Sequence, residues 1–238
     1  MRIGLAYNLR GEDTEQFAEL LTGEDVDRLL SAIRENGHEA VPLEVTGSPD
    51  EILDTIIPAR PDLIFNVAEG LEGVHREAYY PAIFRMLRIP FTGSSSFVLH
   101  VGLDKNLTEA ILMRQGICVP RNFLITDKDQ PLPEDIRYPV IIKPNAEGSS
   151  KGITQASVVE NEEAARERIC ELLPLYAEGL TVEQYIRGRE IAVPWLEAWP
   201  GGVLEVVEWK FKQNNGYQIM TYRSEKAGKL EAVCPPEL

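Results

Sequence analysis

The residues with the clearest chemical potential lie between Tyr138 and Gly152, in the sequence Tyr-Pro-Val-Ile-Ile-Lys-Pro-Asn-Ala-Glu-Gly-Ser-Ser-Lys-Gly. The apolar run at 140–142 is typical of a strand and carries one ammonium group, Lys143, up to a proline. Residues 147–152 then form a loop rich in glycine and serine. Glycines let backbone N–H groups line a concave anion site, and the hydroxyl and ammonium groups add donors and charge. The pattern predicts polyphosphate binding; the alternative is a hairpin turn with an exposed lysine.

This loop follows neither of the common phosphate-binding motifs. The pattern GxxxxGK[ST] of P-loops occurs nowhere in the chain, and GxGxxG is also absent. The net charge of −14 argues against nucleic acid or an anionic membrane as a partner, because both favour basic surfaces. An acidic protein that binds an anion must gather its cations locally, and the candidates are Lys105, Lys143, Lys151 and Lys226.

Length and composition indicate a globular protein of one large or two modest domains. The chain has 238 residues, of which 44% are hydrophobic and 26% charged. Its 3 cysteines are far apart and show no zinc-binding spacing, which fits a reducing compartment. The start of the chain is too short an apolar run for a signal peptide, and no run reaches membrane-spanning length. We therefore expect a cytoplasmic protein.

The elements that position these residues begin with an alternation of strands and helices. Apolar patterning predicts strands at 2–7, 40–45 and 62–67 and helices at 24–36, 49–57 and 76–87. This βαβαβ order predicts a parallel sheet, whose ligands bind at the carboxyl ends of the strands. Those ends are residues 8–11 and 66–73.

The second part of the chain has a different pattern after a linker or bend at 91–96. We expect a helix at 104–115 with Asp104 as its N-cap, strands at 120–125 and 140–143, a charged loop at 126–135, and a helix at 161–173. Strands at 180–186, 191–197 and 203–210 are spaced as in an antiparallel sheet, with a turn at 200–202.

Four motifs in order resemble the D-alanine–D-alanine ligase branch of the ATP-grasp superfamily. They are Gly93-Ser with Asp104-Lys105, then Val140-Ile-Ile-Lys143-Pro, the loop at 147–152, and Val182-Glu-Gln-Tyr-Ile-Arg-Gly-Arg-Glu190. The resemblance covers most of the chain and implies a fold that combines α/β and α+β parts. It implies a Rossmann-like N-terminal (pre-ATP-grasp) domain at 1–96 that binds substrate. A small ATP-grasp subdomain with the phosphate loop would follow at 97–179, and the start of a larger, incomplete one at 180–238.

The resemblance also implies ATP and Mg2+ as cofactors. The implied nucleotide-binding residues are Lys105, Lys143, Glu147, Ser149, Ser150, Glu183, Gln184, Tyr185, Ile186 and Glu190. In this scheme the two lysines contact phosphates and the loop covers the γ-phosphate. Glu183 would accept a hydrogen bond from the adenine amino group, and Glu190 would hold the ribose hydroxyls.

Catalytic and substrate roles follow from the same resemblance. Ser150, Lys226 and Glu12 would act near the transferred phosphoryl group or the substrate amine, and Glu69 and Glu72 would face the first amino acid. The chain departs from the family here. Residues 7–13 replace the Gly-Gly-x-Ser-x-Glu signature, so Glu12 is a displaced candidate. Residues 69–73 replace Gly-Glu-Asp-Gly, so the first amino acid could differ from D-alanine.

The implied reaction joins a carboxylate and an amine into a dipeptide through an acyl phosphate, as in peptidoglycan (cell-wall) synthesis. The partners would be small amino-acid substrates, and a homodimer is open. The alternatives are another ATP-grasp amide or peptide ligase and a nucleotide-binding relic without activity. The metal ligands of complete relatives are expected beyond Leu238. The chain would then be a fragment, one half of an enzyme completed by another subunit, or that relic.

Overall fold

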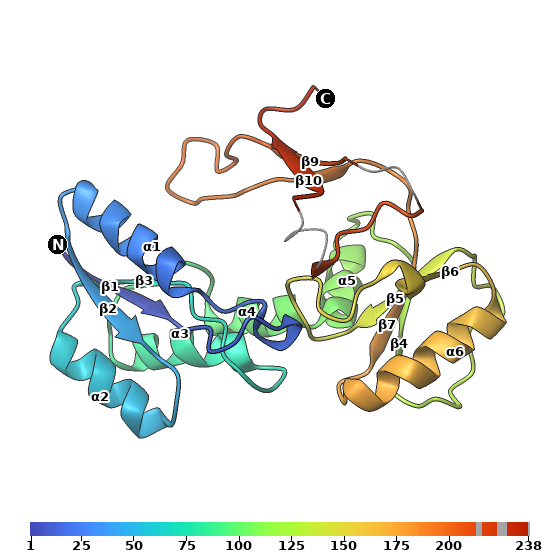
Figure 1. Ribbon diagram of the computed structural model, residues 1–238, viewed down its shortest axis with the longest axis horizontal. Coiled ribbons are helices and arrows are strands. Elements are labelled where there is room, and N and C mark those ends of the chain that lie inside the picture. The colour runs from blue at the N-terminus through green and yellow to red at the C-terminus, as the bar shows by residue number, and fades with distance from the viewer. Residues whose placement is uncertain (213–215, 223–227, 238) are drawn as a thin grey trace. The chain divides into compact units, whose positions relative to one another are not determined.

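The structure, a computed structural model, describes residues 1–212, 216–222 and 228–237. It divides into two compact units (Figure 1). The N-terminal unit contains residues 1–117 together with 145–149, and the C-terminal unit contains residues 118–144 and those from 150 onward. The three-part division at 96 and 179 stays a prediction. Among the described residues, no helix has both the length and the apolar character needed to cross a membrane.

A parallel sheet forms the centre of the N-terminal unit, as the alternating pattern predicts. Strand β1 (Arg2–Tyr7) lies between β2 (Glu39–Glu44) and β3 (Leu63–Asn66), and it pairs with both in parallel register. The connections are helices α1 (Gly23–Glu35) and α2 (Pro49–Ala59). The mixed α/β fold expected for this part of the chain is therefore confirmed.

Helices cover both faces of this sheet because successive side chains of β1 point to opposite sides. Leu5 packs with Leu30 of α1 on one face. On the opposite face of the sheet, Ala6 shares a core with Ile56 of α2 and with residues of α3 (Arg76–Met86) (Figure 1). With both faces covered, the carboxyl ends of the strands are the edge where a ligand can bind.

Capping boxes fix the start of α1 and α2. The hydroxyl oxygen of Thr22 accepts from the N–H of Asp25 at 3.2 Å, and that of Ser48 accepts from the N–H of Glu51 at 3.4 Å. Each acidic side chain accepts in return from the N–H of its N-cap residue. Hydrogen bonds from the Thr22 hydroxyl, from Arg28 and from the Thr22 N–H lower the pKa of the Asp25 carboxyl. Those from the N–H and hydroxyl of Ser48 lower the pKa of Glu51. Such caps stabilise a helix by about 1 kcal/mol.

The segment predicted as a linker leads into a helix that the sequence did not reveal. Residues 91–96 do bend the chain, with Phe91 bridging to β3, and Ser95 then caps α4 (Ser96–Leu103). The mostly apolar residues of α4 show no helical period. Helix α5 (Lys105–Arg114) begins as predicted, since Asp104 Oδ1 accepts from the N–H of Leu107 at 2.9 Å.

The C-terminal unit contains an antiparallel sheet with the order β4-β7-β5-β6. Its strands are β4 (Asn122–Ile125), β5 (Val140–Pro144), β6 (Val158–Val159) and β7 (Leu180–Gln184). Helix α6 (Glu162–Leu172) packs against one face of it (Figure 1). The buried residues between them are Ile125, Val140, Ile142, Val159, Ala165, Ile169, Leu172, Leu180 and Val182. Short 3-10 helices lie at Glu15–Phe17, Gln155–Ser157 and Leu173–Leu175.

A second sheet of this unit corrects one prediction. Strands β8 (Glu190–Ala192), β9 (Val207–Phe211) and β10 (Leu230–Val233) form it in the order β10-β9-β8. The spacing of the strands predicts that 180–186 joins this sheet, but β7 pairs with β4 and β5 instead. The strand predicted at 191–197 ends at Ala192, near Pro194, which has no N–H for a strand ladder.

Candidate functional site

Strand alternation brings a lysine and a carboxylate to one face of the β4-β7-β5-β6 sheet. Val140 and Ile142 of β5 are buried in the core shared with α6, so Ile141 and Lys143 point to the other face. Ile141 lies directly opposite Glu183 of β7 in the antiparallel register. Residues opposite each other share a face, so the Glu183 carboxylate lies on the same side as the Lys143 ammonium.

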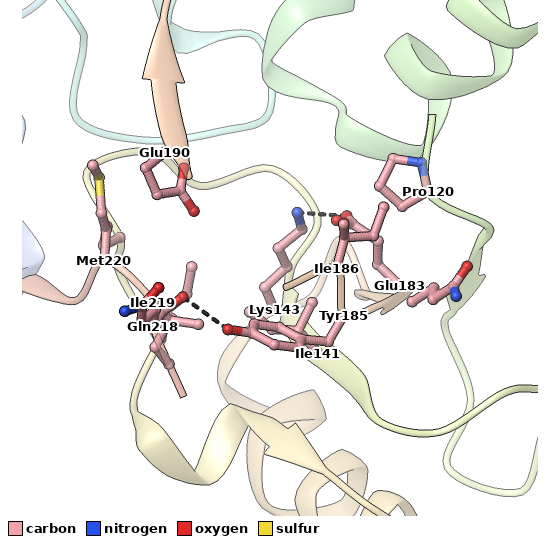
Figure 2. A pocket seen from close by; sticks show the side chains of 13 residues that line it. Pro120, Ile141, Lys143, Glu183, Tyr185, Ile186, Glu190, Gln218, Ile219 and Met220 are labelled. Atoms are coloured by element: carbon pink, nitrogen blue, oxygen red, sulfur yellow. Dashed lines mark hydrogen bonds and ion pairs between the residues drawn. The ribbon is translucent and has the colours of Figure 1, made fainter. Parts of the chain in front are cut away.

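These two groups form an ion pair. Lys143 Nζ lies 2.5 Å from Glu183 Oε2, and the two side chains are 17% and 12% exposed (Figure 2). Reduced contact with water strengthens the attraction between them. An anion that binds the lysine must therefore compete with Glu183 for it.

A cavity of about 360 Å³ opens beside this pair, within the range of small-ligand sites. It is lined by Pro120, Ile141, Lys143, Ser150, Ile153, Glu183, Gln184, Tyr185, Ile186, Glu190, Gln218, Ile219 and Met220 (Figure 2). The lining combines apolar side chains, an ammonium group and two carboxylates. It therefore fits a nucleotide, which has a flat base, hydroxyl groups and an anionic tail.

Two contacts hold residues that lie in or next to the wall of this cavity. Tyr185 donates from its hydroxyl to the carbonyl oxygen of Gln218 at 3.0 Å, which holds that segment at the cavity. Arg189, next to Glu190, makes two hydrogen bonds of 2.7 Å with the Glu208 carboxylate on β9. The hydrogen bonds from Arg189 hold the pKa of Glu208 below its usual value, although burial opposes the shift.

The loop predicted to bind phosphate has an unusual backbone. Ser149 and Ser150 have φ values of 44° and 58°, and Gly152 has a φ of 74°. Few residues other than glycine adopt positive φ, and such conformations gather at ligand-binding sites. Ser150 lines the cavity described above, whereas residues 145–149 belong to the N-terminal unit.

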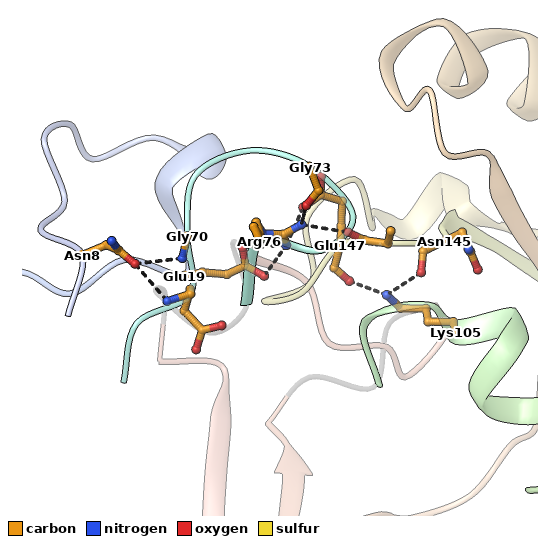
Figure 3. Close-up of polar contacts among 10 residues, drawn as sticks. Asn8, Glu19, Gly70, Gly73, Arg76, Lys105, Asn145 and Glu147 are labelled. Atoms are coloured by element: carbon orange, nitrogen blue, oxygen red, sulfur yellow. Dashed lines mark hydrogen bonds and ion pairs between the residues drawn. The ribbon is translucent and has the colours of Figure 1, made fainter. Parts of the chain in front are cut away.

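Two cations hold three consecutive carbonyl groups at the start of this loop. Lys105 Nζ donates to the carbonyl oxygens of Asn145, at 3.4 Å, and of Glu147 (Figure 3). Arg76 Nη1 donates to the carbonyl oxygen of Ala146 at 3.1 Å. Lys105, predicted to contact phosphate, thus binds the main chain of the loop in this structure.

Arg76 also pairs with two carboxylates. Its Nη2 atom lies 3.0 and 3.1 Å from the two Glu19 oxygens and 3.2 Å from Glu147 Oε2. The arginine is only 4% exposed. Neither Arg76 nor Glu19 was identified from the sequence. A signal existed for Arg76, because a cation at the first position of a helix opposes the helix dipole; Glu19 carries no such signal.

Asn8 organises the carboxyl ends of the parallel strands. It is 1% exposed, and its Oδ1 accepts from the N–H groups of Glu69 at 3.0 Å and Gly70 at 2.8 Å. Its Nδ2 donates to the hydroxyl of Tyr80 at 3.0 Å, and burial raises the pKa of this tyrosine. Asn8 therefore fixes the start of the loop after β3.

The predicted substrate and catalytic acids of the N-terminal unit lie on these loops. Glu12 is exposed after β1, and Glu69 is half-buried. Glu72 is exposed and lines a separate, largely apolar cavity of about 740 Å³ between α2 and α3. Lys226 lies outside the described residues. Within residues 1–212, 216–222 and 228–237, no three acidic, histidine or cysteine side chains gather as a metal site would require.

Comparison with known proteins agrees with the motifs. The family model described as the C-terminus of D-Ala–D-Ala ligase matches residues 116–237. A D-alanine–D-alanine ligase of Aquifex aeolicus is 30% identical over 201 residues, which cover 84% of this chain and 65% of that protein. An uncharacterised protein of Sinorhizobium fredii is 30% identical over 220 residues, which cover 90% of this chain and 63% of that protein. The chain thus spans less than two thirds of the length of these relatives.

Solved structures show the same fold. The D-alanine–D-alanine ligase of Bacillus anthracis, complexed with ATP, superposes with a TM-score of 0.71 at 21% identity. The match covers 100% of this chain and 71% of the ligase chain. The Rossmann-like part followed by part of an ATP-grasp fold, expected from the sequence, is therefore confirmed.

Proposed function

The chain belongs to the D-alanine–D-alanine ligase family, and from this premise we propose that it is an ATP-dependent carboxylate–amine ligase. Its product would be D-alanyl-D-alanine or a similar dipeptide, with ADP and phosphate. The observation that carries the proposal is the cavity beside the Lys143–Glu183 ion pair, which also includes Ser150 and Glu190.

In the proposed complex, ATP occupies this cavity. The adenine ring packs against the apolar side chains, of which Ile186 and Met220 are examples, and its amino group donates to Glu183. The ribose hydroxyls donate to Glu190. Lys143 exchanges its ion pair with Glu183 for the phosphates, so its charge changes partner and stays compensated.

The proposed reaction has two steps. A carboxylate oxygen of the first amino acid attacks the γ-phosphorus, and the bond to the bridging oxygen breaks, which gives ADP and an acyl phosphate. The amine nitrogen of the second amino acid then attacks the acyl carbon, loses a proton, and phosphate leaves with the electron pair of the broken C–O bond. The first step brings two anions together, and two unit charges 4 Å apart repel by about 4 kcal/mol at an effective dielectric of 20. Fixed donors such as Lys143 and Ser150 would offset that repulsion.

Mg2+ stays a predicted cofactor. Because no three acidic, histidine or cysteine side chains gather within the described residues, no step is assigned to a metal held by them. The roles of Glu12, Glu69, Glu72 and Lys226 in binding or orienting the amino acids also stay predictions, as do the small-molecule partners and a homodimer.

One observation favours a second candidate, an ATP-grasp amide or peptide ligase with larger substrates. Glu72 lines an apolar cavity of about 740 Å³ together with Leu71 and Tyr79. That volume is far larger than a methyl side chain needs. An acid or amine with an apolar side chain would use this space, whereas D-alanine would leave it empty.

Calorimetric titration with ATP, followed by an ADP-release assay with Mg2+, tests the proposal. We expect ATP to bind and ADP release to rise when D-alanine is added. A panel of D- and L-amino acids separates the two ligase candidates, since the second predicts a preference for large apolar side chains. ATP binding without ADP release under any condition would indicate a nucleotide-binding protein, and no ATP binding would reject both candidates.

A further inference from the structure

We propose that Arg76 is a positioning residue that sets the conformation of the phosphate loop, although it does not itself contact the nucleotide. The inference rests on the proposed function, in which residues 147–152 bind the phosphates of ATP. All of its contacts described below lie within the N-terminal unit, which includes residues 145–149.

The arginine joins two loops that are far apart in the sequence. Its Nη1 atom donates to the carbonyl oxygen of Gly73, in the loop after β3, at 3.4 Å. The same atom donates to the carbonyl oxygen of Ala146, at the start of the phosphate loop, at 3.1 Å (Figure 3). Its Nη2 atom binds Glu147 of the same loop. A planar guanidinium can make these bonds together only in one orientation, so the two loops are fixed relative to each other.

Burial makes this arrangement specific. The side chain of Arg76 is 5% exposed and that of Glu19 is 7% exposed. A buried charge is tolerated only when it is paired and hydrogen-bonded, so the arginine strongly favours the geometry that satisfies both carboxylates. If residues 146–147 moved away from Arg76, the buried guanidinium would lose its hydrogen bond to the Ala146 carbonyl and its ion pair with Glu147.

Two glycines show how closely the chain approaches this group. A Cβ atom on Gly70 would lie 2.7 Å from Arg76 Cβ, and one on Gly148 would lie 2.1 Å from Glu19 Oε1. Both distances are shorter than side-chain atoms tolerate. The absence of a side chain at Gly148 therefore lets the phosphate loop pack directly on the partner of Arg76.

The hydrogen bonds have a consequence for anion binding. Arg76 and Lys105 together bind the carbonyl oxygens of Asn145, Ala146 and Glu147. Carbonyl oxygens that faced a phosphate would repel it, because both carry negative charge. Arg76 and Lys105 instead direct the negative ends of these three carbonyl groups toward cations.

The test compares Arg76→Lys with Arg2→Lys. Lysine keeps the charge of Arg76 but cannot form the same set of bonds. Arg2 is a matched control in the same unit, since it binds the carbonyl oxygen of Ala59 and pairs with Glu39 at the amino end of β1. Hydrogen exchange of the 144–152 peptide is measured without nucleotide, and ATP affinity is measured by titration.

We expect Arg76→Lys to speed amide exchange in residues 145–149 and to weaken ATP binding by roughly tenfold, the equivalent of one lost charge-assisted hydrogen bond. Arg2→Lys should change neither quantity, even where it lowers the melting temperature as much. Unchanged exchange and unchanged affinity in a folded Arg76→Lys protein would overturn the inference. If that variant does not fold, Glu19→Gln replaces it, with a smaller effect in the same direction.

The outcome also separates this inference from the proposed function. A wild-type protein that binds no ATP rejects the proposed function, and the exchange measurement still decides whether Arg76 holds the loop. A wild-type protein that binds ATP, with an Arg76→Lys variant that binds it equally well and shows the same amide exchange in residues 145–149, rejects only the positioning role.

Discussion

Lys143 and Glu183 lie on neighbouring antiparallel strands and form an ion pair of 2.5 Å at the edge of a cavity. The lysine is thereby held in place with its charge compensated before any anion arrives. In the proposed complex, a nucleotide phosphate would replace Glu183 as the anionic partner of Lys143.

Replacement of Lys143 by methionine should weaken ATP binding most strongly. The substitution keeps most of the side-chain volume and removes the charge that the phosphates need. Loss of a charge-assisted contact costs about 2–3 kcal/mol, so affinity should fall by roughly 30- to 150-fold. Lys128→Met is the control, because Lys128 is an exposed lysine of the same unit that pairs only with its neighbour Asp129 among the ion pairs described. Equal affinities of the two variants would contradict the prediction.

Glu183→Gln tests recognition of the base. If the Glu183 carboxylate accepts from the adenine amino group, the affinity of the variant for ATP relative to GTP should fall about tenfold, because the release of Lys143 from its ion pair affects both nucleotides alike. The measurement is a pair of titrations with ATP and GTP. Glu178→Gln, at an exposed position before β7, should leave both affinities unchanged. A parallel loss for both nucleotides in Glu183→Gln would show that the carboxylate does not read the base.

Gly148→Ala tests the packing of the phosphate loop. The new methyl group would lie 2.1 Å from Glu19 Oε1, which is held by Arg76. We expect a loss of roughly 1–3 kcal/mol in the free energy of unfolding, as for other overpacked sites, together with weaker ATP binding. Gly23→Ala is the matched control, because a methyl group added to Gly23 would meet nothing within 4 Å. Denaturant unfolding of both variants is the measurement, and equal stabilities would refute the prediction.

The Arg189–Glu208 pair predicts a dependence of stability on pH. Hydrogen bonds from Arg189 lower the pKa of Glu208 in the folded protein from its ordinary value of 4.5. The pair's contribution is therefore fully present above the unfolded value and is lost as the pH falls through the lower, folded value. Between about pH 5 and pH 3, the melting temperature of the wild type should fall more steeply than that of Glu208→Gln. The exposed variant Glu205→Gln should follow the wild type, and identical slopes for all three proteins would contradict the prediction.

Much of the fold could be predicted because its elements carry local signals. The parallel strands and α1 follow from apolar periodicity, and the start of α5 follows from Asp104, whose side chain caps the helix. The region after β8 could not be predicted from periodicity. Trp195 and Val203 have strand-like character, yet they are 66% and 48% exposed and form only an isolated bridge. Although these two side chains are apolar, they are not part of a hydrophobic core.

The candidate site was likewise predictable from the sequence only in part. The apolar strand before the glycine- and serine-rich loop pointed to Lys143, and the family resemblance pointed to Glu183; the structure brings the two together. The Arg76 group was missed because its partners are distant in sequence: Glu19 is 57 positions away and Glu147 is 71. Such contacts depend on how loops meet in three dimensions, and no local pattern encodes them.

Photolabelling with 8-azido-ATP tests the central claim most directly, because it reports where the nucleotide base lies. We predict that the label, displaced by unmodified ATP, appears on peptides that contain residues 183–190 or 216–222, because these segments include residues that line the cavity beside Lys143. We also predict that Lys143→Met reduces this labelling. Displaceable labelling confined to peptides of the N-terminal unit, with none at the cavity, would contradict the claim.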